Sequence, residues 1–186
     1  MMQIKRLDRR IMTMTVKTEA IVLKKKSLLH KDVLITLFTE EFGKAHVFAK
    51  GIKKITSRRL SYTQTGNLIK VVLHENKERL YLSEAQLISA FSEIKKDEEK
   101  IQALYCFFFI AERLLPENQK EEAVYNTLKS FEVKLAKERE NTQRLLTRYI
   151  NILMRYLGYV KDKKTFEELI SIIESLIHEK LPTFTI

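Results

Sequence analysis

The sequence predicts an α+β fold in which a small five-stranded β barrel or sandwich precedes an all-helical unit. In residues 1–92, short stretches of β-branched and apolar residues alternate with turn signals, a pattern typical of strands. In residues 93–186, apolar residues recur at intervals of three and four, which is typical of helices. No Gly- or Pro-rich linker separates the two parts, so we expect them to pack against each other. We divide the chain into a basic extension (1–13), a barrel domain (14–92) and a helical domain (93–186).

Five segments of the first half have the composition of β strands. A turn signal, Glu40–Lys44, follows the second segment, and a polar turn, residues 76–78, follows the fourth. Residues 55–65, between the third and the fourth, leave room for one short helical turn. Five short strands at this spacing are typical of a small barrel or sandwich. The predicted strands are Val16–Lys26, Val33–Thr39, Ala45–Ile52, Asn67–Glu75 and Arg79–Phe91.

Four segments of the second half have helical periodicity. The first is apolar almost all the way round and ends at Pro116, so we expect it at the centre of the helical unit. The third begins at Asn141, a good N-cap residue, and ends at Gly158, which suits the position after a helix. The fourth begins with Thr165 and Glu168, the spacing of a capping box. The predicted helices are Asp97–Leu115, one through residues 124–135, Asn141–Gly158 and one from Thr165 through Leu176.

The positive charge of the chain is concentrated in its first half. The net charge is +10 and the pI is about 9.6. Residues 1–92 hold 18 Lys and Arg against 8 Asp and Glu, a balance of +10, whereas residues 93–186 hold 16 of each. A basic half repels itself until a polyanion neutralises it, so this distribution indicates nucleic-acid binding. The alternative is a basic surface that only keeps the protein soluble.

The candidate nucleic-acid contacts fall in three places. The densest is Lys44–Arg59, which contains six cations and no acid. Such a run on one strand and the loop after it can follow a phosphate backbone. The first strand turn and the fourth-to-fifth turn also carry cations, and in a barrel of the OB type these two turns flank the binding groove. Solvated loops at the barrel rim are the alternative interpretation. The candidates are Lys24, Lys25, Lys26, Lys44, Lys50, Lys53, Lys54, Arg58, Arg59, Lys77 and Arg79.

Two aromatic residues lie in or beside the basic segment, where a nucleobase could stack on them. Phe48 alternates with Val47 and Ala49, so it fits the barrel core as well as the surface. We expect Tyr62 to be exposed, and we add it to the candidate contacts.

Arrangements typical of catalysis are missing from the sequence. Cys106 lies in the most apolar helix and is expected to be an inert core thiol. No HExxH or GxxxxGK[ST] motif occurs, and we expect neither enzymatic activity nor a cofactor or metal. The longest apolar run, Ala103–Ala111, is too short for a bilayer span, and we read no export signal, so we expect a cytoplasmic protein. The histidines are scattered over positions His30, His46, His74 and His178.

The segment Thr18–Lys54, TEAIVLKKKSLLHKDVLITLFTEEFGKAHVFAKGIKK, resembles the start of the RecO family of DNA-repair proteins. Further stretches fit the same family within residues 14–160: SRRL (Ser57–Leu60), LYLSEAQLISAF (Leu80–Phe91) and RYINILMRYLGY (Arg148–Tyr159). The resemblance implies an N-terminal OB-fold barrel and a helical domain. The family's basic positions in the third strand and the following loop correspond to Lys50, Lys53, Lys54, Arg58 and Arg59.

The resemblance also implies a function and partners. RecO proteins are recombination mediators that bind single- and double-stranded DNA and anneal complementary strands. With RecR they help to load recombinase onto DNA coated by single-stranded-DNA-binding protein, whose acidic C-terminal tail is a further partner. A nucleoid-associated cytoplasmic location follows from that role. Two alternative functions are an OB-fold RNA-binding factor and an adaptor whose helical domain binds partner proteins.

This sequence departs from the family pattern in three places. Many relatives carry a four-cysteine zinc motif soon after the segment matched by Leu157–Tyr159, and none follows here, so we expect no zinc. The chain ends at Ile186, whereas relatives usually continue through further helices, which we expect to contribute to partner docking. Residues 1–13 precede the usual family start, which Met14 would match, so this stretch is either a basic tail or an over-extended start.

Overall fold

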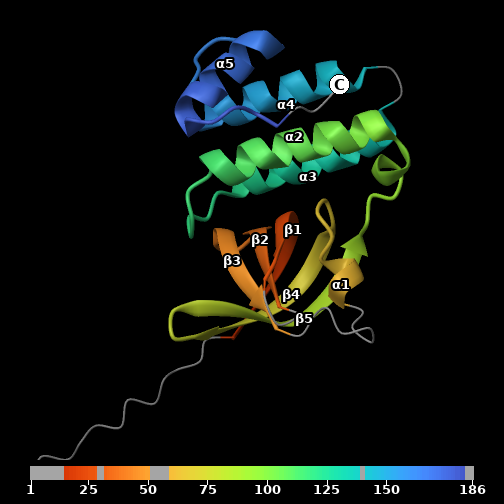
Figure 1. The fold of residues 1–186 in the computed structure, drawn as a ribbon, viewed down its shortest axis with the longest axis vertical. Helices are drawn as coiled ribbons and strands as arrows, with labels where there is room; N and C mark the ends of the chain where they lie inside the picture. The colour runs from red at the N-terminus through yellow and green to blue at the C-terminus, as the bar shows by residue number, and fades with distance from the viewer. Residues whose placement is uncertain (1–14, 29–31, 51–58, 139–140, 183–186) are drawn as a thin grey trace, which may run out of the picture.

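The computed structural model describes residues 15–28, 32–50, 59–138 and 141–182. It confirms the predicted α+β fold, because a closed five-stranded barrel lies at one end of the molecule and four helices are stacked above it (Figure 1). The strands are β1 (Thr15–Ser27), β2 (Val33–Thr39), β3 (Gly43–Ala49), β4 (Leu68–Asn76) and β5 (Arg79–Ser89). The longer helices are α2 (Glu98–Leu114), α3 (Glu122–Lys137), α4 (Thr142–Tyr156) and α5 (Phe166–Ile177). Two short turns, α1 (Arg59–Tyr62) and the 3-10 turn η1 (Ile94–Lys96), complete the described elements.

The barrel closes in the strand order β1-β2-β3-β5-β4. Every neighbouring pair is antiparallel except β3 and β5, which are parallel. Period-two alternation sends every second side chain inward, so β-branched and small residues fill the interior. Lys77 and Glu78 both have positive φ, 50° and 61°, which suits the tight turn that joins β4 to β5. The core of the barrel contains Ala20, Val22, Val33, Ile35, Leu37, Ala45, Val47, Ala49, Ile69, Val71, Leu73 and Leu82.

The helices begin where their capping residues allow. Asp97 accepts a hydrogen bond from the Lys100 backbone at the start of α2, and Asn141 does the same for Arg144 at the start of α4. Both halves of the capping box between Thr165 and Glu168 are present, as predicted. Helix α2 has seven buried residues and contacts α3, α4 and α5, so it holds the central place that its apolar composition predicts.

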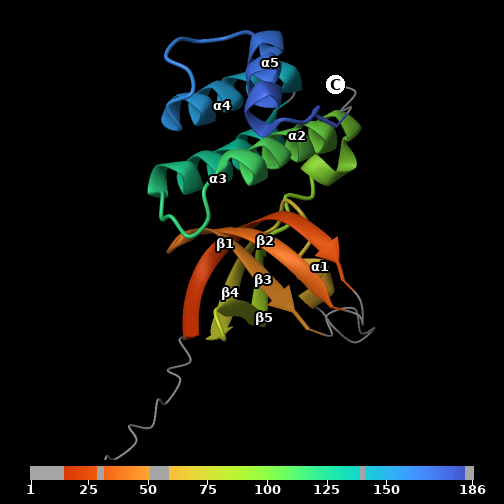
Figure 2. The same ribbon diagram turned by 60° about the vertical axis from the view of Figure 1, so that its left-hand side comes forward.

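The helical unit packs directly on the barrel (Figure 2). Four outward side chains of the strands, Ile21, Leu23, Phe38 and Leu68, belong to the same hydrophobic core as α2, α3 and α4. Polar contacts reinforce this interface: the carboxylate of Glu19 accepts hydrogen bonds from Tyr125 and Lys129 of α3. The predicted packing of the two parts against each other is therefore confirmed.

One glycine sets how closely the two parts approach. Gly43 at the start of β3 has a φ of +74°, and a Cβ atom there would lie 1.8 Å from the carbonyl oxygen of Gln119. The backbone of Lys44, the next residue, accepts a hydrogen bond of 2.9 Å from the Asn118 amide. Only glycine fits this contact, because any side chain would separate β3 from the loop between α2 and α3.

Candidate nucleic-acid interface

The strand register aligns one row of side chains across all five strands. Lys26 of β1 lies opposite Leu34 of β2, and Leu34 lies opposite Phe48 of β3. Phe48 pairs with Tyr81 across the parallel seam, and Tyr81 pairs with His74 of β4. We call these five residues the outer row. The residues on either side of Leu34, Phe48 and Tyr81 along their strands fill the barrel core, so the row faces outward: Val33, Ile35, Val47, Ala49, Leu80 and Leu82.

The aromatic rings of the outer row contact one another. The ring centroids of Phe48 and Tyr81 are 5.8 Å apart, and those of Tyr81 and His74 are 5.3 Å apart with the rings stacked. His74 Nδ1 lies 2.8 Å from the hydroxyl oxygen of Ser83, which holds the imidazole beside the tyrosine. All three rings are only half-buried. They therefore form a continuous surface on which planar groups such as nucleobases can stack.

Two exposed cations lie over these rings. Lys50 Nζ is 4.7 Å from the ring centroid of Tyr81, and the guanidinium carbon of Arg79 is 5.6 Å from that of Phe48. Such contacts contribute about 0.5–1 kcal/mol at exposed sites, enough to orient the cations without neutralising them. None of the ion pairs in the described part of the chain involves either residue. The row thus combines half-buried aromatic rings with two exposed positive charges.

Both turns that the sequence predicts to flank a groove lie at the ends of the outer row. Lys26, close to the end of β1, is exposed and forms one end of the row. At the other end, His74 precedes the β4–β5 turn, whose exposed residues include Lys77 and Arg79. This hairpin protrudes from the barrel in Figure 1.

Three of the candidate lysines lie elsewhere and hold the fold together. Lys44 is buried, with an exposed fraction of 7%, and its Nζ donates to the backbone oxygen of Glu112 over 2.8 Å. Burial also lowers the pKa of Lys44. Lys24 forms an ion pair of 3.3 Å with the Glu112 carboxylate, and Lys25 donates to the side chain of Gln64. Contrary to the expectation from sequence, Lys44 is therefore not available to a phosphate.

Of the remaining candidate DNA contacts, one lies in the barrel wall, and the side chains of the others are not described. Tyr62 is half-buried and packs against the barrel core, contrary to the expected exposure. Lys53, Lys54 and Arg58 lie outside the described residues. Arg59 begins α1, but its side chain is not described.

Sequence reasoning missed Tyr81 and His74. Their strands are readable from the sequence, but the pairing that brings them beside Phe48 is the parallel contact of β3 with β5. Strands that neighbour each other only after barrel closure carry no local signal of that contact.

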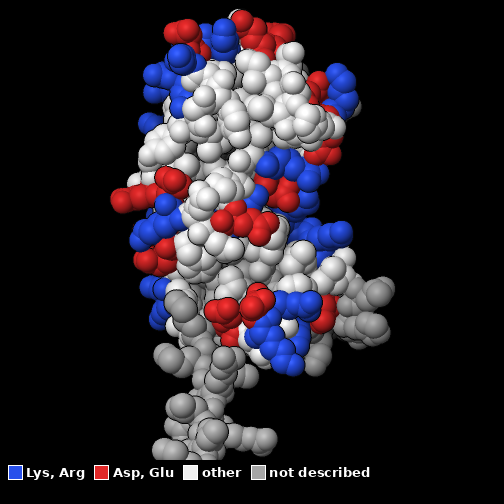
Figure 3. All heavy atoms as spheres, turned by 90° about the vertical axis from the view of Figure 1, so that its left-hand side faces the viewer, with Lys and Arg blue, Asp and Glu red and all other residues white. Residues whose placement is uncertain are grey.

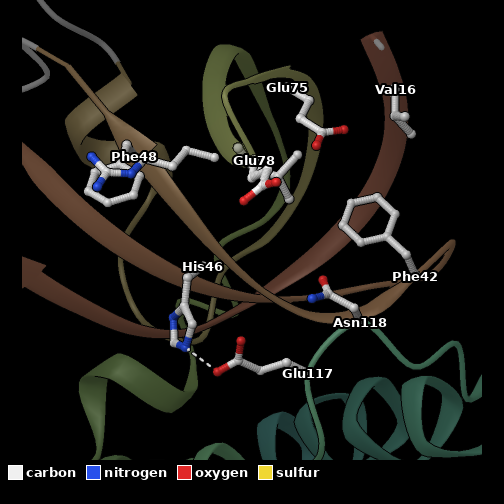
Figure 4. Close-up of a pocket in the computed structure, with 10 residues that line it drawn as sticks. Val16, Phe42, His46, Phe48, Glu75, Glu78, Glu117 and Asn118 are labelled. Carbon is white, nitrogen blue, oxygen red and sulfur yellow. Dashed lines mark hydrogen bonds and ion pairs between the residues drawn. The ribbon is translucent and has the colours of Figure 1, made fainter. Parts of the chain in front are cut away.

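The face that contains the β4–β5 hairpin is mixed in charge. Figure 3 shows this face, on which Lys and Arg atoms are interspersed with Asp and Glu atoms over both the barrel and the helices. A cleft of about 430 Å³ opens beside the outer row, and Phe48, Arg79, Glu75 and Glu78 are among the residues that line it. Figure 4 shows Phe48 and Glu75 at separate places around this cleft. At its floor His46 Nε2 lies 3.0 Å from a carboxylate oxygen of Glu117.

No metal centre can be recognised among the described residues. In those ranges no three His, Cys, Asp or Glu side chains are grouped so that they could hold a metal ion. Cys106 is buried in α2, and burial raises the pKa of its thiol to about 12. No helix in the described part of the chain is long and apolar enough to cross a membrane.

Comparison with known proteins identifies relatives of this chain. Residues 12–91 match the family model described as "Recombination protein O N terminal". The DNA repair protein RecO of Caldanaerobacter subterraneus subsp. tengcongensis is 31% identical over 144 residues, which cover 77% of this chain and 58% of that protein. The protein of the same name from Thermoanaerobacter sp. (strain X514) is 34% identical over 113 residues, 61% of this chain and 46% of that protein. The chain thus spans about half the length of these curated relatives. The segment matched by the family model coincides with the barrel that bears the outer row. The similarity also extends into the helices, because the DNA repair protein RecO of Prosthecochloris aestuarii is 23% identical over 148 residues. The chain belongs to the RecO family.

Proposed function

We propose that this protein is a DNA-binding recombination mediator in DNA repair and that its DNA site is the outer row with Lys50 and Arg79. It binds single- and double-stranded DNA, promotes the annealing of complementary strands and acts with RecR in loading recombinase. The observation that carries the proposal is the contact series Phe48–Tyr81–His74 beneath two exposed cations. Family membership supports DNA repair as the setting.

The two kinds of group in the site act on different parts of DNA. Cations neutralise phosphates and release counterions, which gives affinity for either form of DNA that is independent of sequence and declines with salt. The rings can stack only on bases that are not already stacked in a duplex, and each stacked base contributes about 1–3 kcal/mol. Single strands therefore use the whole row, whereas a duplex uses its cations alone.

The cations of the site can also promote annealing, and this requires no catalytic group. Two strands repel each other through their phosphates, and a surface of cations screens this repulsion. Lys53, Lys54, Arg58 and Arg59, which the family resemblance proposes as contacts, add four positive charges that follow Lys50 closely in the sequence.

The proposal is tested by separating stacking from charge. Tyr81→Ala removes the central ring of the row, and we expect single-stranded DNA to bind roughly 5- to 150-fold more weakly, the equivalent of about 1–3 kcal/mol, with little change for duplex DNA. Lys50→Ala combined with Arg79→Ala should weaken both forms and reduce the salt dependence. Fluorescence anisotropy over a range of salt concentrations measures these effects, and thermal unfolding shows whether each variant is folded. Equal losses in the control Lys134→Ala/Lys137→Ala, which removes two exposed cations from α3, would contradict the site assignment.

Relative affinity also distinguishes the alternatives. A preference for structured RNA over single-stranded DNA would favour the RNA-binding factor. No binding of either nucleic acid at physiological salt would favour the adaptor.

For the acidic tail of single-stranded-DNA-binding protein, we propose a groove along α4. A cleft of about 940 Å³ follows this helix, and three exposed arginines line it, Arg144, Arg148 and Arg155. Ile152, also in the lining, is 36% exposed and supplies an apolar contact. None of the ion pairs among the described residues involves these arginines. Positive charge beside an apolar side chain is what an acidic peptide with an apolar residue requires.

A peptide of that tail, labelled with a fluorophore, tests the groove. Arg144→Glu with Arg148→Glu should weaken peptide binding at least roughly tenfold, because like charges replace attraction. The pair Lys134→Glu and Lys137→Glu changes the charge by the same amount on α3 and should leave peptide affinity nearly intact. Similar losses in both pairs would show that the peptide responds only to net charge and would exclude α4 as its site.

A further inference from the structure

A pocket lies where β1 of the barrel meets α2 of the helical unit. Its volume is about 310 Å³, at the lower end of the range of about 300–1,000 Å³ that is usual for small-ligand sites. Strand β1 contributes Lys24 and Lys25 to its wall, and the loop before β4 contributes Gln64. Helix α2 contributes aromatic rings, among them Tyr105 and Phe109. We call this site the junction pocket.

The two rings of α2 offer a surface on which a planar group can stack. Tyr105 and Phe109 are four residues apart, so they lie on one face of the helix, one turn apart. Tyr105 is 47% exposed, although a ring of this size gains free energy from burial, and Phe109 is half-buried. None of the ring contacts in the described part of the chain involves Tyr105. Its ring is therefore available to a planar ligand.

The protein only partly neutralises the lysines of the junction pocket. Lys25 Nζ donates over 3.0 Å to the uncharged side chain of Gln64, and no ion pair in the described ranges involves this lysine. Burial lowers the pKa of Lys25, because it penalises the charged form. Lys24 pairs with Glu112 over 3.3 Å, but its side chain is 43% exposed and its ammonium group has three donors. An anionic group at the pocket would stabilise both charges.

The junction pocket adjoins one end of the outer row. Lys26, which forms that end, is exposed and follows Lys25 directly in β1. Two residues of a strand span about 7 Å, and side chains two residues apart lie on the same face, so Lys24 and Lys26 are neighbours on the outside of the barrel. A phosphate backbone that crosses the outer row to Lys26 therefore meets further cations at the pocket.

We propose that the junction pocket binds one unstacked nucleobase of a single strand that lies along the outer row. The base stacks on Tyr105 and Phe109. The phosphates beside it contact Lys24 and Lys25. A base within a duplex does not enter, because it is already stacked between its neighbours. This inference rests on the proposed DNA site and extends it to α2, so that the helical unit takes part in distinguishing single strands from duplexes.

A nucleotide matches the pocket better than an acidic peptide does. It presents a flat ring with an anion beside it, and the pocket presents half-exposed rings with cations beside them. An acidic peptide would use the charge of Lys24 and Lys25 but would leave the ring of Tyr105 without a planar partner.

Oligonucleotide length separates the junction pocket from the outer row. Fluorescence anisotropy measures binding of unstructured single strands from about 4 to about 16 nucleotides, the span of OB-fold site sizes. Tyr105→Ala should leave the shortest strands unaffected and weaken binding of the longest at least roughly fivefold, because only these lose a stacked base. Tyr105→Phe keeps the ring and should bind as the wild type does. The matched control, Tyr159→Ala, removes an exposed ring outside the pocket and should have no effect.

A scan with abasic nucleotides identifies the base that enters the pocket. In the shortest strand that responds to Tyr105→Ala, each nucleotide in turn is replaced by an abasic one. One position should weaken binding to the wild type and cause no further loss with Tyr105→Ala, because the base and the ring form a single contact. Abasic positions over the outer row should weaken binding to both proteins. Thermal unfolding shows that each variant is folded.

The outcomes separate the junction pocket from the proposed DNA site. A loss with Tyr105→Ala that is equal for every strand length, or that duplex DNA shares, would overturn the pocket. Weaker binding of the acidic tail peptide with no change for DNA would also overturn it, because the pocket would then be a protein site. If Tyr81→Ala weakens single-strand binding and Tyr105→Ala does not, the pocket is refuted and the outer row stands. No binding of any strand by the wild type would refute both.

Discussion

Replacing Glu132 should make the protein more stable at neutral and alkaline pH. This residue of α3 is completely buried, and neither carboxyl oxygen has a hydrogen-bond partner among the described residues. Gly66, whose φ is +77°, brings its backbone against it, and a Cβ atom on Gly66 would lie 3.7 Å from Glu132 Oε1. Burial raises the pKa of Glu132 well above its usual value, and the nearby ammonium group of Lys95 offsets only part of that effect. Lys95 itself donates to the side chain of Asn67.

The sign of the pH dependence follows from the raised pKa. In the unfolded chain Glu132 loses its proton near pH 4.5, whereas in the folded chain it keeps the proton to a higher pH. The unfolded state is therefore favoured as the pH rises between these two values. The stability present below about pH 4.5 declines by up to about 1.4 kcal/mol per pH unit until the folded pKa is reached. Glu132→Gln has no such titration, and Glu132→Met also removes the unpartnered polar group, which otherwise costs about 1–3 kcal/mol.

Denaturant unfolding at pH 5, 6, 7 and 8 measures the effect. The free energy of unfolding of Glu132→Gln, minus that of the wild type, should rise with pH, and Glu132→Met should be the most stable of the three at pH 8. The control Glu84→Gln removes an exposed carboxyl from β5. A difference that does not change with pH, or a Glu132→Gln variant that loses stability relative to the wild type as pH rises, would refute the reasoning. The first result would mean that folding does not shift the pKa of Glu132, and the second that Glu132 is ionised and paired, with Lys95 as the partner.

Three further predictions follow from particular residues. Gly43→Ala should reduce the free energy of unfolding by about 2 kcal/mol or more, because both the positive φ and the contact with Gln119 exclude a side chain; a loss below about 0.5 kcal/mol in denaturant melts would contradict that contact. Replacing Lys53, Lys54, Arg58 and Arg59 together by alanine should weaken DNA binding and flatten its salt dependence by about 0.7 for each phosphate contact to a single strand; unchanged binding isotherms would remove this segment from the site. A thiolate-selective reagent at pH 8 should label Cys106 only after unfolding, because burial raises its pKa to about 12, and labelling of the native protein followed by mass spectrometry would disprove its burial.

Local patterns were enough to predict the elements of this fold. Alternation of apolar residues located all five strands within a few residues, and the capping residues Asp97, Asn141 and Thr165 mark the starts of three helices. These signals lie within a few residues of one another in the chain, so no knowledge of tertiary contacts is needed to read them. The buried Glu132 shows the limit of this approach. Its position in α3 is compatible with an exposed helix face, and only the packing of α3 against Gly66 and Leu104 reveals that it is enclosed.

The candidate site was predictable in part, because charge is visible in a sequence whereas pairing across a barrel is not. Lys50 and Arg79 were identified from basic composition and lie beside the aromatic rings. Lys44 belongs to the same basic segment as Lys50 but points at α2, where its Nζ donates to the backbone oxygen of Glu112. The difference between these two lysines arises from where the helical unit covers β3, which no local pattern records.

That covering also explains why the outer row remains open. Apart from Glu19, Lys24 and Lys44, whose charged groups have partners in the helical unit, the outward side chains discussed here belong to two groups. One group is purely aliphatic or aromatic without polar atoms, as in Ile21, Leu23 and Phe38, and burying it under α2 and α3 costs no hydrogen bonds. The other group, which includes Tyr81 and His74, carries a hydroxyl and a ring nitrogen and has Lys50 beside it. Covering this second group with helices would strip water from polar atoms and a charge, so the free energy of folding favours leaving it at the surface. A ligand that itself brings flat rings and anionic oxygens replaces that water with matching contacts, which is why nucleic acid is the partner that suits this face best.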